Sequence, residues 1–277
     1  VEDNIAPEIV SALEERSDYR ARRDAIRAHN ARGGWLRKGI ALTPVKFGIS
    51  FTATQYNQAG ALVHVYTDGT VHLNHGGTEM GQGLYVKVAQ VVAEEFQIDI
   101  EKVRVTATTT GKVPNTSATA ASSGADLNGK AAQNAAATIK ERLIGFAVEN
   151  WGVPREQVVF LPNRVRIGNQ EIPFGNLVRT AYMARIQLSS TGFYKTPEIH
   201  WDRAAGRGKP FYYFSYGAAA AEVTVDTLTG EYRVDRVDIL HDVGQSLNPA
   251  LDRGQVEGGF VQGMGWLTME ELWWDQR

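Results

Sequence analysis

The sequence predicts an α+β fold in which mixed sheets and hairpins pack against helices. Strand-like and helix-like stretches occur in separate runs, which is typical of α+β proteins rather than of a doubly wound parallel sheet. Residues 61–75 and 221–240 each alternate apolar and polar side chains around a short turn that contains glycine, which indicates two antiparallel hairpins. Hydrophobic residues make up 43% of the 277 positions, enough for a substantial core in one or two domains.

Residues 1–35 are expected to form a charged helical segment, with one amphipathic helix over residues 5–31 that ends before Gly33. Its apolar side carries Ile9, Val10, Leu13 and Ile26. The basic cluster at 20–27 is interpreted as a solvated helix face. Nucleic-acid binding is the less favoured alternative, because Tyr19 is the only stacking aromatic side chain beside these charges.

The next two portions repeat one order of elements. Residues 36–146 are expected to contain a β-rich stretch (46–54), the first hairpin (61–75), a Gly-rich loop (76–83), a helix (84–96), a loop of small residues (106–125) and an Ala-rich helix (126–146) closed by Gly145. Residues 147–277 are expected to contain the second hairpin (221–240), a second Gly-rich loop within 252–265 and a helix. We interpret hairpin, Gly-rich loop and helix as a reused supersecondary unit.

The stretch "GGTEMGQG", residues 76–83, places four glycines directly before a predicted helix. It does not fit the dinucleotide fingerprint, because Val86 stands where the third glycine is required, and no Gly-Lys-Ser/Thr follows to complete a phosphate loop. The remaining interpretation is a set of bare backbone amides at a helix N-terminus, suited to anions or polarised oxygens. A tight turn from hairpin to helix explains the glycines equally well.

Sixteen of the twenty residues at 106–125 are Ala, Ser, Thr or Gly, which is also the composition of a flexible linker. The stretch leads directly into a predicted helix, so we expect a loop that offers hydroxyl and amide donors. Only Lys112 and Lys130 supply positive charge nearby. Two Gly-rich helix starts and one Ser/Thr-rich start together predict a large ligand with several polar edges.

Composition excludes several classes of site. The absence of cysteine excludes disulfides and thiolate metal sites, so an iron–sulfur cluster would have to lie on another chain. A chain without cysteine is also compatible with the reducing cytoplasm. A net charge of −2 and the lack of a stretch of about 20 apolar residues give no sign of nucleic-acid or membrane binding. His64, His72 and His75 lie near one hairpin, but metal binding is not favoured, because His72 and His75 would point to opposite faces of a regular strand.

Six motifs in order, from about residue 36 to the C-terminus, resemble the molybdopterin-binding subunit of xanthine dehydrogenase, within the molybdenum hydroxylases. They are "KFGISFT", "HGGTEMGQG", "VPNTSATAAS", "TGFY", "PFYYFSYG" and "LNPALDRGQVEGGFVQGMG". The resemblance implies a bipartite domain that binds molybdenum through a pterin dithiolene, so that the metal needs no protein ligand set.

The resemblance also implies roles for particular residues. Phe51 would stack on a planar substrate and Thr52 would contact it, and Ala120 and Ala121 would keep the pocket open beside the metal. Gln82 and the backbone of Ala121 would lie next to the molybdenum. The residues implied to bind the cofactor are Gly81, Gln82, Gly83, Ala121, Ser122 and Gln255.

The implied reaction is the oxidation of purines, hypoxanthine and xanthine to urate, by attack of a metal-bound hydroxide and transfer of a hydride. Electrons would pass through [2Fe–2S] clusters and FAD on partner chains to NAD. The implied assembly is a hetero-oligomer with the remaining segments of the subunit and an iron–sulfur/FAD subunit. An aldehyde or other N-heterocycle hydroxylase is the alternative in the same family, and a β-rich assembly or binding module is the alternative that is not an enzyme.

This chain departs from the family pattern at several points. It has no Gly-Glu-x-Pro motif to carry the general-base glutamate, and the substrate-clamping Arg and Glu belong to an N-terminal half that is not in this sequence. Many relatives have Cys-Ser where this chain has Ala220 and Ala221. We therefore expect a middle-to-late portion of the subunit, with no catalytic residue of its own and no turnover alone.

Overall fold

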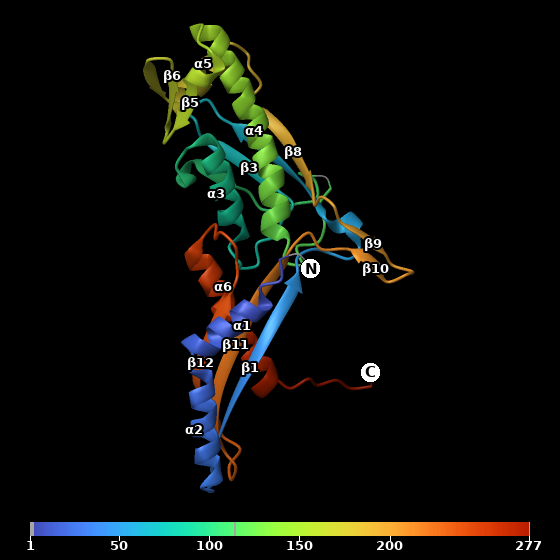
Figure 1. Cartoon of the computed structure of the whole chain (residues 1–277). Helices are drawn as coiled ribbons and strands as arrows, with labels where there is room; N and C mark the ends of the chain where they lie inside the picture. The colour runs from blue at the N-terminus through green and yellow to red at the C-terminus, as the bar shows by residue number, and fades with distance from the viewer. Residues whose placement is uncertain (1–2, 114, 277) are drawn as a thin grey trace. The chain divides into compact units, whose positions relative to one another are not determined.

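The computed structural model describes residues 3–113 and 115–276, which form two compact units (Figure 1). One unit combines the segment that ends at Gly48 with Tyr213–Ser246 and the segment that begins at Asp252. The other unit combines Ile49–Tyr212 with Leu247–Leu251. The α+β class predicted from the sequence is confirmed, because both units combine mixed sheets or hairpins with packed helices.

The first unit is built on a three-stranded antiparallel sheet with the order β1-β11-β12. Its strands are β1 (Leu36–Gly48), β11 (Phe214–Asp226) and β12 (Tyr232–His241). The predicted hairpin at 221–240 is confirmed by β11 and β12, with Gly230 in the turn at φ 79°. The predicted β-rich stretch at 46–54 is largely wrong, because β1 pairs with β11 from Leu36 and ends at Gly48.

Two helices of the first unit pack against this sheet, α1 (Ala6–Arg16) and α2 (Tyr19–Ala31). The single helix predicted over residues 5–31 is therefore wrong. Asp18 adopts a left-handed backbone at φ 52°, and the Ser17 hydroxyl donates to the Leu13 carbonyl at 2.6 Å, so the chain turns between the helices. The predicted apolar side is right in its main members. Buried there are Ile9, Leu13 and Ile26, and the first two join Tyr216, Ala218 and Ala220 in one core.

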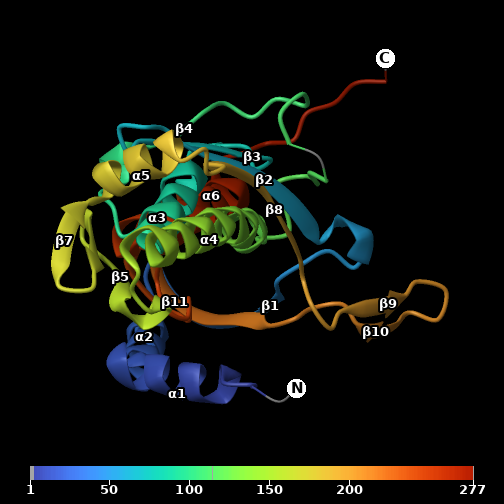
Figure 2. The ribbon, with the colours of Figure 1, turned by 90° about the horizontal axis from the view of Figure 1, so that it is seen from above.

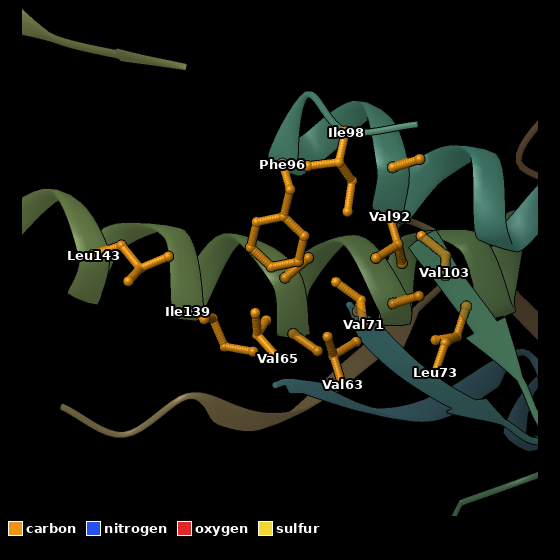
Figure 3. Packing of buried hydrophobic residues seen from close by; sticks show 14 of the residues in the cluster. Val63, Val65, Val71, Leu73, Val92, Phe96, Ile98, Val103, Ile139 and Leu143 are labelled. Atoms are coloured by element: carbon orange, nitrogen blue, oxygen red, sulfur yellow. The ribbon is translucent and has the colours of Figure 1, made fainter. Parts of the chain in front are cut away.

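The second unit contains a four-stranded sheet with the order β4-β3-β2-β8. Its strands are β2 (Gln58–Val65), β3 (Val71–His75), β4 (Val103–Val105) and β8 (Ser189–Lys195). Helices α3 (Leu84–Phe96) and α4 (Gly124–Trp151) lie side by side against it (Figures 1 and 2). Figure 3 shows Phe96 and Val92 of α3 pointing toward Val63 and Val71 of the strands, with Ile139 of α4 beside them. The predicted hairpin at 61–75 and helix at 84–96 are both confirmed.

Helix α4 is longer than predicted. Gly145 does not close it, because the next two residues, Phe146 and Ala147, are buried and continue the apolar side of the helix. The helix ends instead at Trp151 and is capped by Gly152, whose φ of 63° gives the left-handed conformation that glycine adopts most easily.

The rest of the second unit forms small sheets and turns. Strands β5 (Val158–Leu161), β6 (Arg164–Ile167) and β7 (Gln170–Pro173) make an antiparallel sheet next to α5 (Phe174–Met183). The other elements are η1 (Thr54–Tyr56), η2 (Ile100–Lys102), η3 (Arg155–Gln157), β9 (His200–Asp202) and β10 (Arg207–Lys209). The aromatic stretch at 209–217 is divided between the two units: Tyr216 is buried in the first, while Tyr212 and Tyr213 are exposed.

The second Gly-rich stretch is helical and not a loop. Residues 252–265 lie inside α6 (Pro249–Thr268), so the expected helix is present, and only the expected loop within this stretch is wrong. The glycines there do not adopt a positive φ, whereas Gly244, in the connection before the helix, does at 60°. The glycine content of this stretch suggests a loop, whereas the spacing of Val256, Phe260 and Met264 indicates a helix, so the two sequence signals disagree. Among the described residues, no helix combines the length and apolarity needed to cross a membrane.

Candidate functional site

The Gly-rich loop at 76–83 connects the end of β3 to the start of α3. Gly81 and Gly83 have φ values of 98° and 75°, which side chains rarely tolerate. Gly76 is required by space, because a Cβ atom there would lie 2.1 Å from Oγ1 of Thr116. The glycines therefore serve both a tight turn and the close approach of a second loop.

The amides that the sequence predicted to be bare are bound to a carboxylate of the same loop. Oε1 of Glu79 accepts hydrogen bonds from the backbone N of Gly81 at 2.9 Å and of Gly83 at 3.0 Å. Oε2 accepts from the backbone N of Tyr85 at 2.9 Å. Burial would raise the pKa of Glu79, but the N–H donors around it outweigh burial and hold that pKa below its ordinary value. The loop does bind an anionic group at the helix start, and that group is the side chain of Glu79.

Gln82 folds back onto the same loop. Its Oε1 accepts from the backbone N of Met80 at 2.6 Å, and its Nε2 donates to the carbonyl of Thr78 at 2.8 Å. The side chain is half-buried and bridges the turn that Glu79 also holds. Its role beside a cofactor stays a prediction.

The second loop carries Ala120, Ala121 and Ser122 just before α4. Ala121 and Ser122 both have φ 56°, a left-handed backbone that costs a non-glycine residue about 1–2 kcal/mol. Two such residues in succession are a local concentration of strain, of the kind found at ligand-binding sites. The hydroxyl of Ser123 donates to the Ala120 carbonyl at 3.2 Å and helps to hold the turn.

The structure brings these two loops together. The backbone N of Thr78 donates to Oγ1 of Thr119 at 2.9 Å. Deeper in the unit, the hydroxyl of Thr108 donates to the Gly77 carbonyl at 2.7 Å and lies 3.2 Å from the hydroxyl of Tyr85. Gln82 and Ala121 therefore belong to two loops that share a hydrogen-bonded junction.

Phe51 and Thr52 lie in the segment before β2, and this segment is fixed by a side chain that sequence reasoning missed. The buried amide of Asn57 accepts from the Phe51 N and donates to the Phe51 carbonyl, both at 2.8 Å. The adjacent Gln58 accepts at its Oε1 from Nδ2 of Asn115 at 3.0 Å. The Phe51 segment and the small-residue loop are thus tied to the same end of β2.

His75, at the end of β3, is a second residue that sequence reasoning did not place in the site. It is 2% exposed, its Nδ1 accepts from the Gly77 N at 3.1 Å, and its Nε2 has no partner among the described residues. Burial lowers the pKa of His75 to about 4, although Glu79 opposes this. His75 is therefore neutral at pH 7, and its ring holds the start of the Gly-rich loop through the hydrogen bond from Gly77. Its position directly before the glycine pair was the available sequence signal.

Two further predictions concern Gln255 and the histidines near the first hairpin. Gln255 is exposed on α6 and belongs to the first unit, whereas the other implied site residues belong to the second. Its contact with a cofactor stays a prediction. His64 and His72 are cross-strand neighbours with ring centroids 6.0 Å apart, but the described residues contain no group of three or more His, Cys, Asp or Glu that could hold a metal ion.

Comparison with known proteins gives a family and several close relatives. The profile of the molybdopterin cofactor-binding domain family matches residues 12–277. The chain is 49% identical over 252 residues to xanthine dehydrogenase of Oryza sativa subsp. japonica, which covers 91% of this chain and 17% of that protein. It is 43% identical over 275 residues to xanthine dehydrogenase of Dictyostelium discoideum, covering 98% of this chain and 19% of that protein. The chain thus spans less than a fifth of the length of these curated relatives.

Solved structures support the same fold. Quinoline 2-oxidoreductase from Pseudomonas putida 86 matches with a TM-score of 0.79 at 23% identity, over 98% of this chain and 35% of that one. The Cu,Mo-CO dehydrogenase matches with a TM-score of 0.81 at 20% identity, over 97% of this chain and 35% of that one. At these identities the likeness concerns the fold.

Proposed function

We propose that this chain, which belongs to the molybdopterin cofactor-binding domain family, contributes the cofactor site of a molybdenum hydroxylase that oxidises purines. The observation that carries the proposal is the hydrogen-bonded junction between Thr78 and Thr119. It joins the loop that contains Gln82 to the strained loop that contains Ala121. The xanthine dehydrogenases among the relatives support purines as the substrate class.

The donors at this junction fit a pterin cofactor, whose edges carry several hydrogen-bonding atoms. The two loops contain hydroxyls, the carboxamide of Gln82 and small side chains, but the backbone amides of residues 77, 78, 80, 81 and 83 are already hydrogen-bonded within the protein. Gln82 and Ser122 would hold the cofactor by their side chains, and Ala121 by its backbone. Because the N–H groups of Gly81 and Gly83 are bound to Glu79, these glycines would contribute bare backbone surface rather than donors.

When bound, the molybdenum cofactor supplies a redox centre that takes two electrons from the substrate carbon while water provides the oxygen. The residues of this chain bind and orient the substrate. Phe51 would stack on the planar ring, and Thr52 would contact its edge. Ala120 and Ala121 would leave the approach open, because they carry the smallest side chains after glycine.

The rest of the enzyme would come from other segments or chains. We place the general-base glutamate and the substrate-clamping groups on the remaining segments of the molybdopterin subunit. The [2Fe–2S] clusters and FAD would lie on partner chains of a hetero-oligomer that passes electrons to NAD in the cytoplasm. Gln255 would be a further cofactor contact.

A second candidate is the oxidation of an aldehyde or another N-heterocycle. It is favoured by the character of the proposed substrate residues, because Phe51, Thr52 and the two alanines recognise a flat, apolar ring without any charged side chain. These residues alone do not select a purine over quinoline-like rings. An assembly module that binds no cofactor is the alternative outside enzymes.

The experiment uses the full-length protein that contains this chain, isolated with its partners. Molybdenum and pterin are measured per protein, and turnover is compared among xanthine, hypoxanthine, an aliphatic aldehyde and quinoline. We expect near-stoichiometric molybdenum and pterin and the highest kcat/KM with the purines. Stoichiometric cofactor with a higher kcat/KM for the aldehyde or quinoline would favour the second candidate. Protein free of molybdenum and pterin would contradict the proposed function.

A further inference from the structure

We propose that Glu79 is a positioning residue whose carboxylate fixes the Gly-rich loop and so holds Gln82 in the orientation that the cofactor requires. This inference rests on the proposed function for the role of Gln82. The hold of Glu79 on the loop is a separate claim about the chain itself. Glu79 acts through its neighbours and is not expected to touch substrate.

The argument starts from the two glycines that flank Gln82. Gly81 and Gly83 have the positive φ values that the turn requires, but glycine also has the greatest backbone freedom of any residue. A loop of this composition would leave the residue between them free to reorient. A side chain that must meet a cofactor needs instead a single, preorganised position.

Glu79 removes that freedom. The amides on both sides of Gln82, those of Gly81 and Gly83, donate to one atom, Oε1 of Glu79, at 2.9 and 3.0 Å. The backbone of Gln82 is therefore clamped at both ends by the same oxygen. The second oxygen, Oε2, receives the Tyr85 N–H at 2.9 Å and anchors the clamp to the first turn of α3.

The side chain of Gln82 completes the arrangement from the other direction. It bonds to the backbone N of Met80 and the carbonyl of Thr78, the residues on either side of Glu79. Each side chain thus binds backbone groups of the two residues that flank the other one: Glu79 binds those beside Gln82, and Gln82 binds those beside Glu79. Thr78 also binds Thr119 of the second loop, so a change at Glu79 would be transmitted to the junction of both loops.

Two substitutions separate the parts of this clamp. Glu79→Gln keeps one carbonyl oxygen, which can still accept from Gly81 and Gly83, but its amide nitrogen would face the Tyr85 N–H donor. Glu79→Ala removes all three acceptor contacts. Glu149→Gln is the matched control, because Glu149 is exposed on α4 and the same charge is removed away from the loop.

The experiment uses the full-length holoenzyme and measures molybdenum content, hydrogen exchange of a peptide that covers residues 80–86, kcat and KM. We expect Glu79→Ala to expose the amides of Gly81, Gly83 and Tyr85 to fast exchange and to lower kcat roughly 10- to 100-fold with little change in KM. Glu79→Gln should recover part of both effects. Glu149→Gln should match the wild type.

A double-mutant cycle with Gln82→Ala tests whether Glu79 acts through Gln82. In the Gln82→Ala background, Glu79→Ala should lower kcat by less than about threefold, because the group that it positions is gone. Full multiplication of the two losses, or unchanged exchange of the 80–86 peptide in Glu79→Ala, would overturn the positioning role. If Glu79→Ala fails to assemble, the same cycle and exchange measurement are made with Glu79→Gln.

The two proposals fail in different ways. Wild-type protein without molybdenum and pterin would overturn the proposed function, and with it the role of Gln82 toward a cofactor. Wild-type protein with full cofactor, combined with a Glu79→Ala variant of normal turnover and normal loop exchange, would overturn only the role of Glu79.

Discussion

Gly192 of β8 packs so closely on Ala131 of α4 that a Cβ atom at position 192 would lie 2.0 Å from the Ala131 carbonyl oxygen. Backbone atoms of the helix cannot turn aside as a side chain would. We therefore expect Gly192→Ala to push β8 away from α4 and to destabilise the second unit by about 2–3 kcal/mol. Hydrogen exchange of the β8 and α4 peptides in the full-length protein measures this.

Gly145→Ala is the control for that prediction, because it lies in the same helix, and apart from the adjacent helical turns no described atom lies within 4 Å of the added carbon. Removing a glycine from an exposed helix interior should stabilise α4 by about 0.5–1 kcal/mol. If Gly192→Ala exchanged as slowly as Gly145→Ala, the close contact of β8 with α4 would be disproved.

The buried His75 predicts a loss of stability in mild acid. Its ordinary pKa of 6.5 is lowered to about 4 by burial, so the unfolded chain takes up a proton at this group before the folded chain does. The free energy of unfolding is therefore highest above pH 6.5 as far as His75 is concerned. It decreases as the pH falls toward about 4 and levels off below that value. The full effect is on the order of 3 kcal/mol.

Urea unfolding of the wild type and of His75→Gln at pH 7, 5.5 and 4 checks this prediction. The wild type should lose stability faster than the variant across the interval from 6.5 to 4, because glutamine does not titrate. If the free energy of unfolding changed with pH by the same amount in the two proteins, the pKa of His75 would not be lowered in the folded state.

Arg22 predicts how strongly α2 is attached to the sheet of the first unit. Its Nε lies 2.9 Å from Oε2 of Glu222 and its Nη1 lies 2.8 Å from Oδ2 of Asp238, and the Arg22 side chain is only 14% exposed. Arg22→Ala would remove the cation that the two carboxylates share and, among the described residues, leave Glu222 with Lys38 alone and Asp238 with Arg236 alone. We expect a loss of about 2–3 kcal/mol, less than for a fully buried pair.

Arg20→Ala provides the comparison on the same helix. The Arg20 side chain is 81% exposed and pairs with Glu14 in solvent, so its loss should lower the stability much less than the loss of Arg22. Urea midpoints of the two variants separate the cases. A smaller effect for Arg22→Ala than for Arg20→Ala would contradict the ion-pair network between α2 and the sheet.

Gln82→Ala is expected to lower turnover of the full-length enzyme with little effect on folding. The side chain is half-buried on the Gly-rich loop and contributes nothing to the apolar core. We expect a reduction in kcat of roughly 10- to 100-fold, as for loss of a positioned hydrogen-bonding group. The variant is assayed for kcat and for its urea midpoint, and unchanged turnover would remove Gln82 from the cofactor site.

Ala121→Leu is expected to block substrate entry while molybdenum content stays normal. Ala121→Gly is the matched control, since it keeps the site open and relieves the left-handed backbone at φ 56°, with a gain of about 1 kcal/mol. The two variants are compared by kcat/KM and by metal analysis. Wild-type kinetics in Ala121→Leu would place Ala121 outside the substrate path.

Local patterns were sufficient for many elements. Alternation around Asp68-Gly69 and Thr229-Gly230 predicted both hairpins, and the spacing from Leu84 to Phe96 predicted α3. The same method failed where composition and periodicity disagreed, as in α6, where glycines suggested a loop. It also failed at Gly145, where burial of Phe146 and Ala147 continued the helix.

The sequence by itself determined the α+β class, the hairpins and the small-residue loops, because each follows from residues that are neighbours along the chain. Only the tertiary structure decided that the Gly-rich amides bind Glu79 and that Thr78 meets Thr119. The sequence shows that backbone N–H donors are present in the loop, but not which acceptor binds them in the folded chain. That choice depends on distances of a few ångströms between groups that the folded backbone brings together.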